Sequence, residues 1–265
     1  MFVEAVGGWL ANSLTLIADA GHMFLDAGAL GFAWYAAHIS HRSGNQTLSY
    51  GYHRAQVLAA FVNGLTLAAL VLFILWEAIS RFQNPEPMDA LPALSIAITG
   101  LIVNIIAFYM LHSGEQNMNV RAATLHVLGD MLGSAAAIVA ALTVYLTGWM
   151  YADPILAFII ALVLGRGAYR VINESAHILL EGAPEHLDIA EIRDTLTDTV
   201  PGVLEVHHVH AWSLTAEKPL LTLHASVDEH TDISGTISHM KEILKRRFGV
   251  DHSTIQVETG HCPDH

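Results

Sequence analysis

The chain has 265 residues, of which 53% are hydrophobic and 14% charged, and its formal net charge is −13. Soluble domains carry about 25% charged residues, so this composition excludes an ordinary soluble enzyme and indicates a membrane protein. The 17 histidines outnumber the 12 Lys and Arg residues, which points to metal or proton chemistry. Cys262 is the single cysteine, so an intramolecular disulfide is excluded.

The apolar runs predict several membrane spans, because a helix that crosses a bilayer needs ~20 mostly apolar residues. Residues 1–10 resemble the second half of a span, so either the sequence begins inside a helix or these residues lie at the membrane interface. Asp153 and Pro154 suit the start of the last span, since Pro fits the first turn and Asp complements the helix dipole. Full-length spans are predicted at 17–39, 55–76, 90–114, 122–146 and 151–172.

The basic residues near the spans orient the membrane domain. By the positive-inside rule, arginines gather on the cytoplasmic side. The loops that carry most of them, and the C-terminal tail, are therefore predicted to be cytoplasmic. These arginines are Arg42, Arg54, Arg121, Arg166 and Arg170.

Residues 183–265 have the composition of a small soluble domain, with 14 Asp or Glu against 6 Lys or Arg. This acidic balance argues against nucleic acid as a partner. Asp188 suits the cap of a helix over 189–200, and two alternating stretches, 203–214 and 220–228, predict a β-hairpin. A helix over 233–248 and a strand over 253–258 complete the order α-β-β-α-β, which predicts a two-layer α+β domain.

A His-Asp pair with the spacing i, i+4 occurs in two of the predicted spans. GHMFLD contains His22 and Asp26, and LHVLGD contains His126 and Asp130. Residues at this spacing share one helix face, so two facing helices bring together two imidazoles and two carboxylates. This is the number and chemistry of a tetrahedral zinc site, and pairing or metal binding offsets the cost of burying charge.

Small residues beside the pairs permit close approach of the two helices; they include Gly21, Gly28, Gly129 and Gly133. The alternative is that each pair is a separate His–Asp hydrogen bond within a polar cavity. Two copies on separate spans favour a shared site. Asp19 is interpreted as an end-of-helix residue and Asn104 as a polar helix contact, and neither is assigned to the metal.

The chain resembles the zinc-exporting branch of the cation diffusion facilitator family over nearly its whole length. The similarity lies in LIADAGHMFLDAGAL, YGYHRAQVLAAFVNG, NPEP, NVRAATLHVLGDMLGS, ADPILA and VHHVHAWSL. It implies a polytopic α-helical membrane domain over 1–182, a six-helix bundle whose first helix is truncated here. A small α+β ferredoxin-like cytoplasmic domain over 183–265 would follow.

The resemblance also implies a function, a homodimeric zinc/proton antiporter in a lipid bilayer. Zinc would be both the transported substrate and a regulatory ligand, with Cd²⁺ or Co²⁺ as further substrates. The family's transport ligands, a pair on the second helix and a pair on the fifth, correspond to His22, Asp26, His126 and Asp130.

Three features depart from the family pattern. The first helix lacks its N-terminal half, and Gln56 stands where relatives often have Glu. The loop 112–121 lacks the histidine-rich insertion of many eukaryotic members, which favours a bacterial inner membrane.

The tail offers further ligands. By resemblance the cytoplasmic site uses His207, His224 and Glu258, with His239 as a ligand of an adjacent site, and His261 and Cys262 are weaker candidates. Strand alternation predicts His208 and His210 on one face and His207 on the other. The alternatives are solvent-facing histidines on a small sheet and a frayed, solvated terminus.

Two other functions compete with transport. A metal-sensing or metal-binding membrane protein without transport fits the same ligands. An intramembrane metal-dependent hydrolase would need an open coordination position, whereas four protein ligands leave none and the sequence has no HExxH motif.

Overall fold

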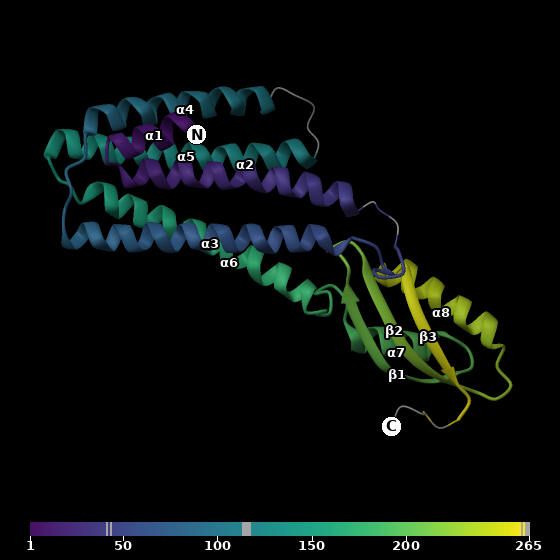
Figure 1. Cartoon of the computed structure of the whole chain (residues 1–265). Coiled ribbons are helices and arrows are strands. Elements are labelled where there is room, and N and C mark those ends of the chain that lie inside the picture. Colours follow the sequence, from purple (N-terminus) through teal and green to yellow (C-terminus); the bar gives the residue numbers. More distant parts are fainter. Residues whose placement is uncertain (41, 43, 113–117, 261, 263–265) are drawn as a thin grey trace. The chain divides into compact units, whose positions relative to one another are not determined.

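The computed structural model describes residues 1–40, 42, 44–112, 118–260 and 262. In this part of the chain the first elements are α1 (Phe2–Leu10), α2 (Leu14–Ser40), α3 (Arg54–Gln83), α4 (Ala90–His112), α5 (Met118–Thr147) and α6 (Ala152–Leu179). They are followed by α7 (Ile189–Thr199), β1 (Val203–Ser213), β2 (Pro219–Val227), α8 (Ile233–Phe248) and β3 (His252–Glu258) (Figure 1). The order confirms a helical membrane domain and a small α+β domain.

The chain divides into two compact units. One contains Met1–Ala33 and Val62–Ile172, and the other contains Trp34–Phe61 and Asn173–His265. The division passes through α2, α3 and α6, so one end of each of these helices groups with the α+β domain.

Four of the described helices are long and apolar enough to cross a membrane: Arg54–Gln83, Ala90–Leu111, His126–Thr147 and Ala152–Leu179. They overlap four of the predicted spans. The fifth prediction falls within α2, which has 27 residues but is not among these four. This helix carries Asp19, His22 and Asp26 in its first half, and ionisable residues in a membrane helix mark a functional site.

A sharp turn separates α1 from α2. The first helix has nine residues, fewer than the ~20 needed to cross a bilayer. Asn12 in the turn has φ of 52°, a left-handed conformation that Asn adopts more readily than most residues.

Asp153 caps the start of α2 from the start of α6. Its carboxylate accepts hydrogen bonds from Ser13 Oγ at 2.8 Å and from the backbone N–H groups of Leu14 and Thr15 at 2.6 and 3.2 Å. Asp153 is 1% exposed, and the first N–H groups of a helix have no partner within that helix. The structure therefore confirms Asp153 at the beginning of the last span but directs its side chain to another helix.

Arg81 ties this cap to α3. Its guanidinium donates to the backbone oxygen and the side-chain oxygen of Asn12, each at 2.8 Å, and its Nε donates to Glu77 at 2.9 Å. Arg81 Nη1 also lies 3.7 Å from Asp153 Oδ2. The buried carboxylate is thus paired with a buried cation, as buried charges require.

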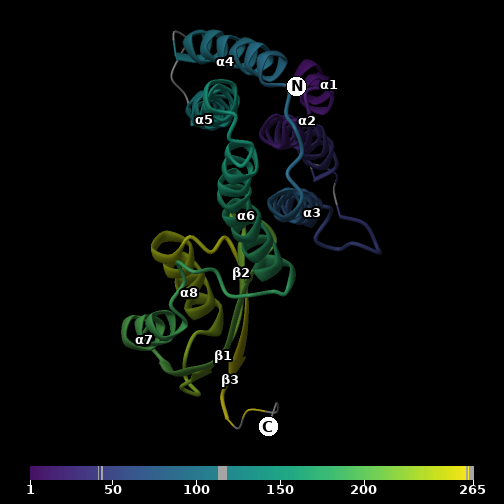
Figure 2. The ribbon, with the colours of Figure 1, turned by 90° about the vertical axis from the view of Figure 1, so that its left-hand side faces the viewer.

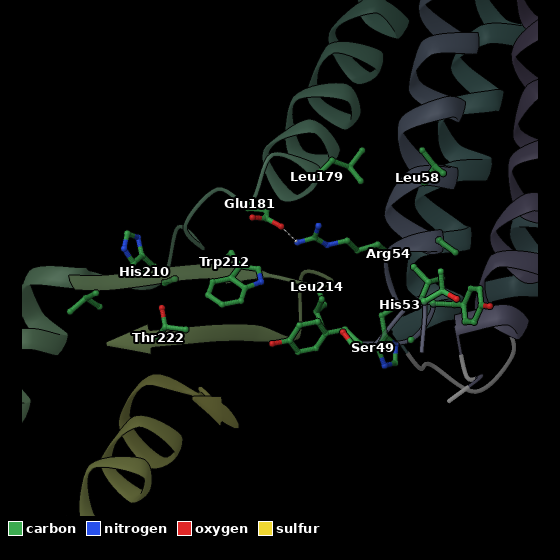
Figure 3. Close-up of a pocket in the computed structure, with 18 of the residues that line it drawn as sticks. Ser49, His53, Arg54, Leu58, Leu179, Glu181, His210, Trp212, Leu214 and Thr222 are labelled. Carbon is green, nitrogen blue, oxygen red and sulfur yellow. Dashed lines mark hydrogen bonds and ion pairs between the residues drawn. The ribbon is translucent and has the colours of Figure 1, made fainter. Parts of the chain in front are cut away.

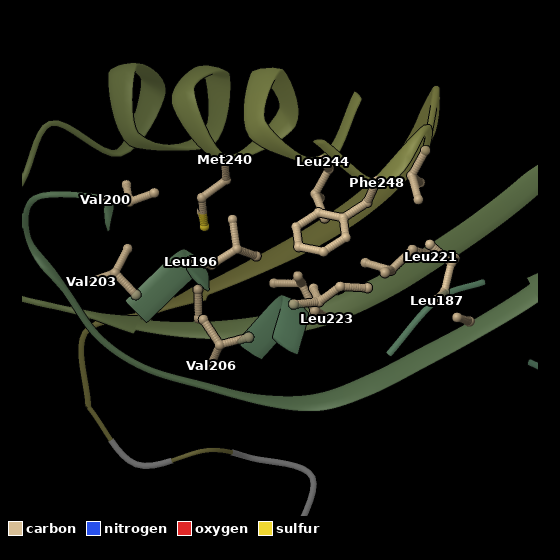
Figure 4. Packing of buried hydrophobic residues seen from close by; sticks show 14 of the residues in the cluster. Leu187, Leu196, Val200, Val203, Val206, Leu221, Leu223, Met240, Leu244 and Phe248 are labelled. Atoms are coloured by element: carbon tan, nitrogen blue, oxygen red, sulfur yellow. The ribbon is translucent and has the colours of Figure 1, made fainter. Parts of the chain in front are cut away.

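The α+β domain has two layers. The strand order is β1-β2-β3, with β1 antiparallel and β3 parallel to β2, and α7 and α8 cover one face of the sheet (Figure 2). Asp188 caps α7 by accepting from Ala190 and Glu191, as predicted. The core between the layers includes Leu196, Val206, Leu223, Met240 and Leu244 (Figure 4).

A β-bulge interrupts β1. His207 pairs with His224 and His210 pairs with Thr222, so three steps along β1 match two along β2. One extra residue therefore lies in β1, and His208 there has φ of 47°. Histidine is among the residues enriched in this left-handed region.

We expect Asp153→Ala to destabilise the protein by at least about 2 kcal/mol, because it leaves buried N–H groups of α2 without their acceptor and removes the carboxylate that pairs with buried Arg81. The midpoint of thermal unfolding in detergent should fall by several degrees. Asp198→Ala removes an exposed carboxylate from α7 and should leave the midpoint unchanged. Equal midpoints for the two variants would show that the cap does not stabilise the fold.

Candidate functional site

The structure brings the two His-Asp pairs of α2 and α5 together. Asp26 Oδ2 lies 3.3 Å from His22 Nε2 on its own helix and 3.3 Å from His126 Nε2 on α5. His126 Nε2 also lies 3.8 Å from Asp130 Oδ2, and the two imidazole centres are 6.1 Å apart. The four predicted residues therefore form one cluster rather than two separate pairs.

The donor atoms of this cluster suit a small cation. One donor each from His22, Asp26 and Asp130 lies within 4.8 Å of the others. Asp130 is 6% exposed, and among the described residues His22 Nδ1, Asp26 Oδ2 and Asp130 Oδ1 are buried atoms with no hydrogen-bond partner. Buried carboxylates need such partners or a metal, and two imidazoles with two carboxylates match a tetrahedral zinc ion.

Asp19 lies next to this cluster and corrects one interpretation. It is inside α2, 3% exposed, and accepts a hydrogen bond from Ser134 Oγ of α5 at 3.3 Å. The interpretation of Asp19 as an end-of-helix residue is therefore wrong, because α2 begins one turn earlier than predicted. Asn104 Nδ2 of α4 donates to Ser134 Oγ at 3.3 Å, which confirms Asn104 as a polar helix contact.

The small residues contribute unequally to close approach of the helices. A methyl group added at Gly133 would collide with the Asp19 carboxylate, and one added at Gly21 would press against Leu70. Within the described part of the chain, nothing lies within 4 Å of the corresponding position at Gly28 or Gly129. Of these four glycines, close approach to another helix requires Gly133 most clearly.

The α+β domain holds a second cluster, on the sheet. His207 and His224 are direct partners across β1 and β2, and their ring centres are 5.6 Å apart. Glu258 on β3 places Oε1 2.9 Å from His224 Nδ1 and Oε2 3.3 Å from His207 Nε2. The three residues expected to form the cytoplasmic site are therefore neighbours.

Burial acts to raise the pKa of the Glu258 carboxyl. This effect is outweighed by hydrogen bonds with Cys262 and Gln256 and by the nearby imidazoles of His207 and His224, which all lower the pKa. The pKa of Glu258 consequently lies below its ordinary value. An ionised carboxylate beside two imidazoles favours binding of a cation.

His208 joins this cluster, contrary to the prediction from strand alternation. Its ring centre lies 5.0 Å from that of His224 and 5.3 Å from that of His207. The prediction that placed His208 and His207 on opposite faces is wrong because the bulge adds a residue between His207 and His210. The signal was in the sequence: the apolar residues Val206, Val209 and Ala211 are spaced by three and then two, which breaks the period of a regular strand.

Cys262 also reaches the cluster. Its Sγ lies 3.6 Å from His224 Nδ1 and 3.9 Å from His208 Nδ1, and the residue is 7% exposed. The alternative of a frayed, solvated terminus is therefore wrong at Cys262. His261 lies outside the described residues.

His239 lies apart from the sheet cluster. It is exposed on α8, beside Thr195, Thr199 and Glu242. Neither of the groups of potential metal ligands in the described part of the chain includes it.

A pocket of about 910 Å³ lies within the second unit (Figure 3). Its wall includes His210 and Trp212 of β1, together with Arg54 and Glu181, whose side chains pair at 3.0 Å. His210 thus lines this pocket, while His207, His208 and His224 do not.

Comparison with known proteins assigns a family to both parts of the chain. The family model described as the cation efflux transmembrane domain matches residues 1–180, and that described as cation efflux protein, cytoplasmic domain, matches residues 184–260. The chain is 46% identical over 264 residues to the zinc transporter ZitB of Escherichia coli strain K12, covering 99% of this chain and 84% of that protein.

A second relative is the cadmium, cobalt and zinc/H(+)-K(+) antiporter of Bacillus subtilis strain 168, 40% identical over 265 residues, with 98% of this chain and 85% of the relative covered. The solved metal-bound C-terminal domain of the CzcD transporter from Cupriavidus metallidurans is 33% identical, with a TM-score of 0.26, covering 27% of this chain and 99% of its own. With family models matching nearly its whole length, the chain belongs to the cation efflux, or cation diffusion facilitator, family.

Proposed function

We propose that this protein is a zinc efflux transporter that exchanges cytoplasmic Zn²⁺ for protons. The observation that carries the proposal is the convergence of His22, Asp26, His126 and Asp130 from two helices of the membrane domain. The relatives named zinc transporter and cadmium, cobalt and zinc antiporter support the choice of cargo. Imidazole nitrogens favour zinc and its neighbours over Mg²⁺ or Ca²⁺, which prefer six or more oxygens.

The ligand chemistry couples zinc to protons. A histidine must be neutral to bind a metal ion, so zinc entering the site favours proton release from His22 and His126. Protons that arrive from the other side of the membrane favour release of zinc for the same reason. An inward proton gradient would thereby drive zinc out of the cytoplasm.

The sheet cluster is proposed as a regulatory zinc site of the cytoplasmic domain. His207, His224 and Glu258 approach one another within hydrogen-bonding or ion-pair distance, and three such donors suit zinc. A homodimer in a bacterial inner membrane is proposed from the family of the cytoplasmic domain and from the bacterial relatives.

Two alternatives receive less support. A hydrolase needs a coordination position for water and substrate, which four protein donors occupy in a tetrahedral site. A sensor that binds zinc without transporting it would keep the same clusters, so a transport measurement must separate it from an antiporter.

We expect Asp130→Ala to abolish zinc uptake into sealed inverted vesicles, because it removes a ligand and a compensating charge together. Uptake by the unchanged protein should stop when the pH gradient is collapsed. His38→Ala removes an exposed imidazole from α2 outside the cluster and is the control that should transport normally.

Three outcomes of this assay are informative. Uptake by Asp130→Ala at the unchanged rate would reject the transport site. Uptake that ignores the pH gradient would reject proton antiport. Zinc binding without uptake by the unchanged protein would favour a sensor.

His224→Ala and His239→Ala should differ in zinc binding. Calorimetry on the full chain in detergent should show that His224→Ala loses one class of zinc sites, since His224 lies at the centre of the sheet cluster. His239→Ala should retain that class, because His239 lies outside the cluster. Loss of the same sites in both variants would instead make His239 a ligand.

A further inference from the structure

The sheet cluster contains more donors than the three expected from the family. His207, His208, His224 and Cys262 each offer one ligand atom, and these atoms all lie within 4.8 Å of one another. We propose that His208 and Cys262 are metal ligands that complete, with His207 and His224, a four-donor zinc site within one chain. The proposal rests on the proposed cytoplasmic zinc site and changes its donor set.

The bulge in β1 makes His208 available. In a regular strand, adjacent residues point to opposite faces, and His208 would then point away from His207. The extra residue and the φ of 47° at His208 bring both adjacent imidazoles to His224. A short connection after β3 returns Cys262 to the same place.

Two edges of the donor set have the length expected in a zinc tetrahedron. With Zn–S of about 2.3 Å and Zn–N of about 2.1 Å, the sulfur–nitrogen edge of a tetrahedron is about 3.6 Å. Cys262 Sγ lies 3.6 Å from His224 Nδ1 and 3.9 Å from His208 Nδ1. The remaining donor pairs lie within 4.8 Å of one another, and side-chain rotations that shorten these distances would complete the site.

Buried polar atoms give independent support for a cation at this place. Among the described residues, His207 Nδ1 is buried with no hydrogen-bond partner, and the buried atoms His207 Nε2 and Glu258 Oε2 have only their ion-pair contact with each other at 3.3 Å. Glu258 is 7% exposed, so its carboxylate is nine-tenths buried beside the cluster. A divalent ion bound by a Cys262 thiolate next to ionised Glu258 would leave this buried site without net charge.

The donor set also defines the class of metal. Three imidazoles and a thiolate are borderline and soft ligands, which favour Zn²⁺ and Cd²⁺ over Mg²⁺ or Mn²⁺. Glu258 then lies beside the metal ligands and supplies negative charge, rather than the fourth donor of a tetrahedral ion.

Cys262 allows a direct test because it is the single cysteine of the chain. The full protein in detergent is treated with a maleimide at increasing zinc concentrations, and labelling is followed by intact mass. Zinc should slow labelling. His208→Asn removes the imidazole, and Asn suits a left-handed backbone. In this variant the zinc concentration that protects half of the Cys262 thiols should rise at least about tenfold. Even the loss of a residue that only supports a metal ligand typically lowers metal affinity by about that factor.

His210→Asn is the matched control, since it makes the same change on the same strand outside the cluster. It should protect Cys262 as the unchanged protein does. If Cys262 of the His208→Asn variant is half-protected at the same zinc concentration as in the unchanged protein, His208 is not a ligand. Equal labelling of the unchanged protein with and without zinc would overturn the whole proposal.

A second measurement does not depend on the folding of a variant. Co²⁺ added to the unchanged protein should give a thiolate-to-cobalt charge-transfer band, which the single thiol assigns to Cys262; absence of the band would overturn the proposal. Asp130→Ala should abolish zinc transport yet leave the band and the protection unchanged. Failure of the transport proposal is thereby distinguished from failure of this one.

Discussion

The carboxylate of Asp153 fixes the position at which α2 begins, and the membrane site depends on that position. It holds the first N–H groups of the helix and is itself held by Arg81. His22 follows the start of α2 at Leu14 by eight residues, which is a rise of about 12 Å along the helix axis. A shift of one residue at the start would turn His22 and Asp26 by about 100° away from α5.

Both clusters share one electrostatic design. In each, a carboxylate lies beside two imidazoles, the combination through which the proposed transport site would exchange protons for a divalent ion. In the membrane cluster the acid Asp26 contacts both imidazoles, whereas in the sheet cluster Glu258 does so. The two clusters differ in their scaffold. The membrane cluster is built from residues spaced i, i+4 on two helices, and the sheet cluster from residues on three strands.

The sequence predicted the features that follow from local periodicity. Helical spacing placed His22 with Asp26 and His126 with Asp130, and alternation and turns gave every element of the α+β domain. It did not predict contacts made between distant elements, such as the cap of α2 by Asp153 or the bond between Ser134 and Asp19. Strict alternation does not predict the position of His208, because β1 contains a bulge there. A bulge depends on the register of the neighbouring strand as well as on local sequence.

The return of Cys262 to the bulge has a consequence for chain entropy. His208 and Cys262 are 54 residues apart, and a permanent cross-link over such a loop would restrict the unfolded chain by about 4 kcal/mol. A metal ion held between them would act as a reversible cross-link that spans β2, α8 and β3. Because a ligand that binds the folded state stabilises it in proportion to the logarithm of its concentration, the stability of this domain would itself vary with the zinc concentration of its surroundings.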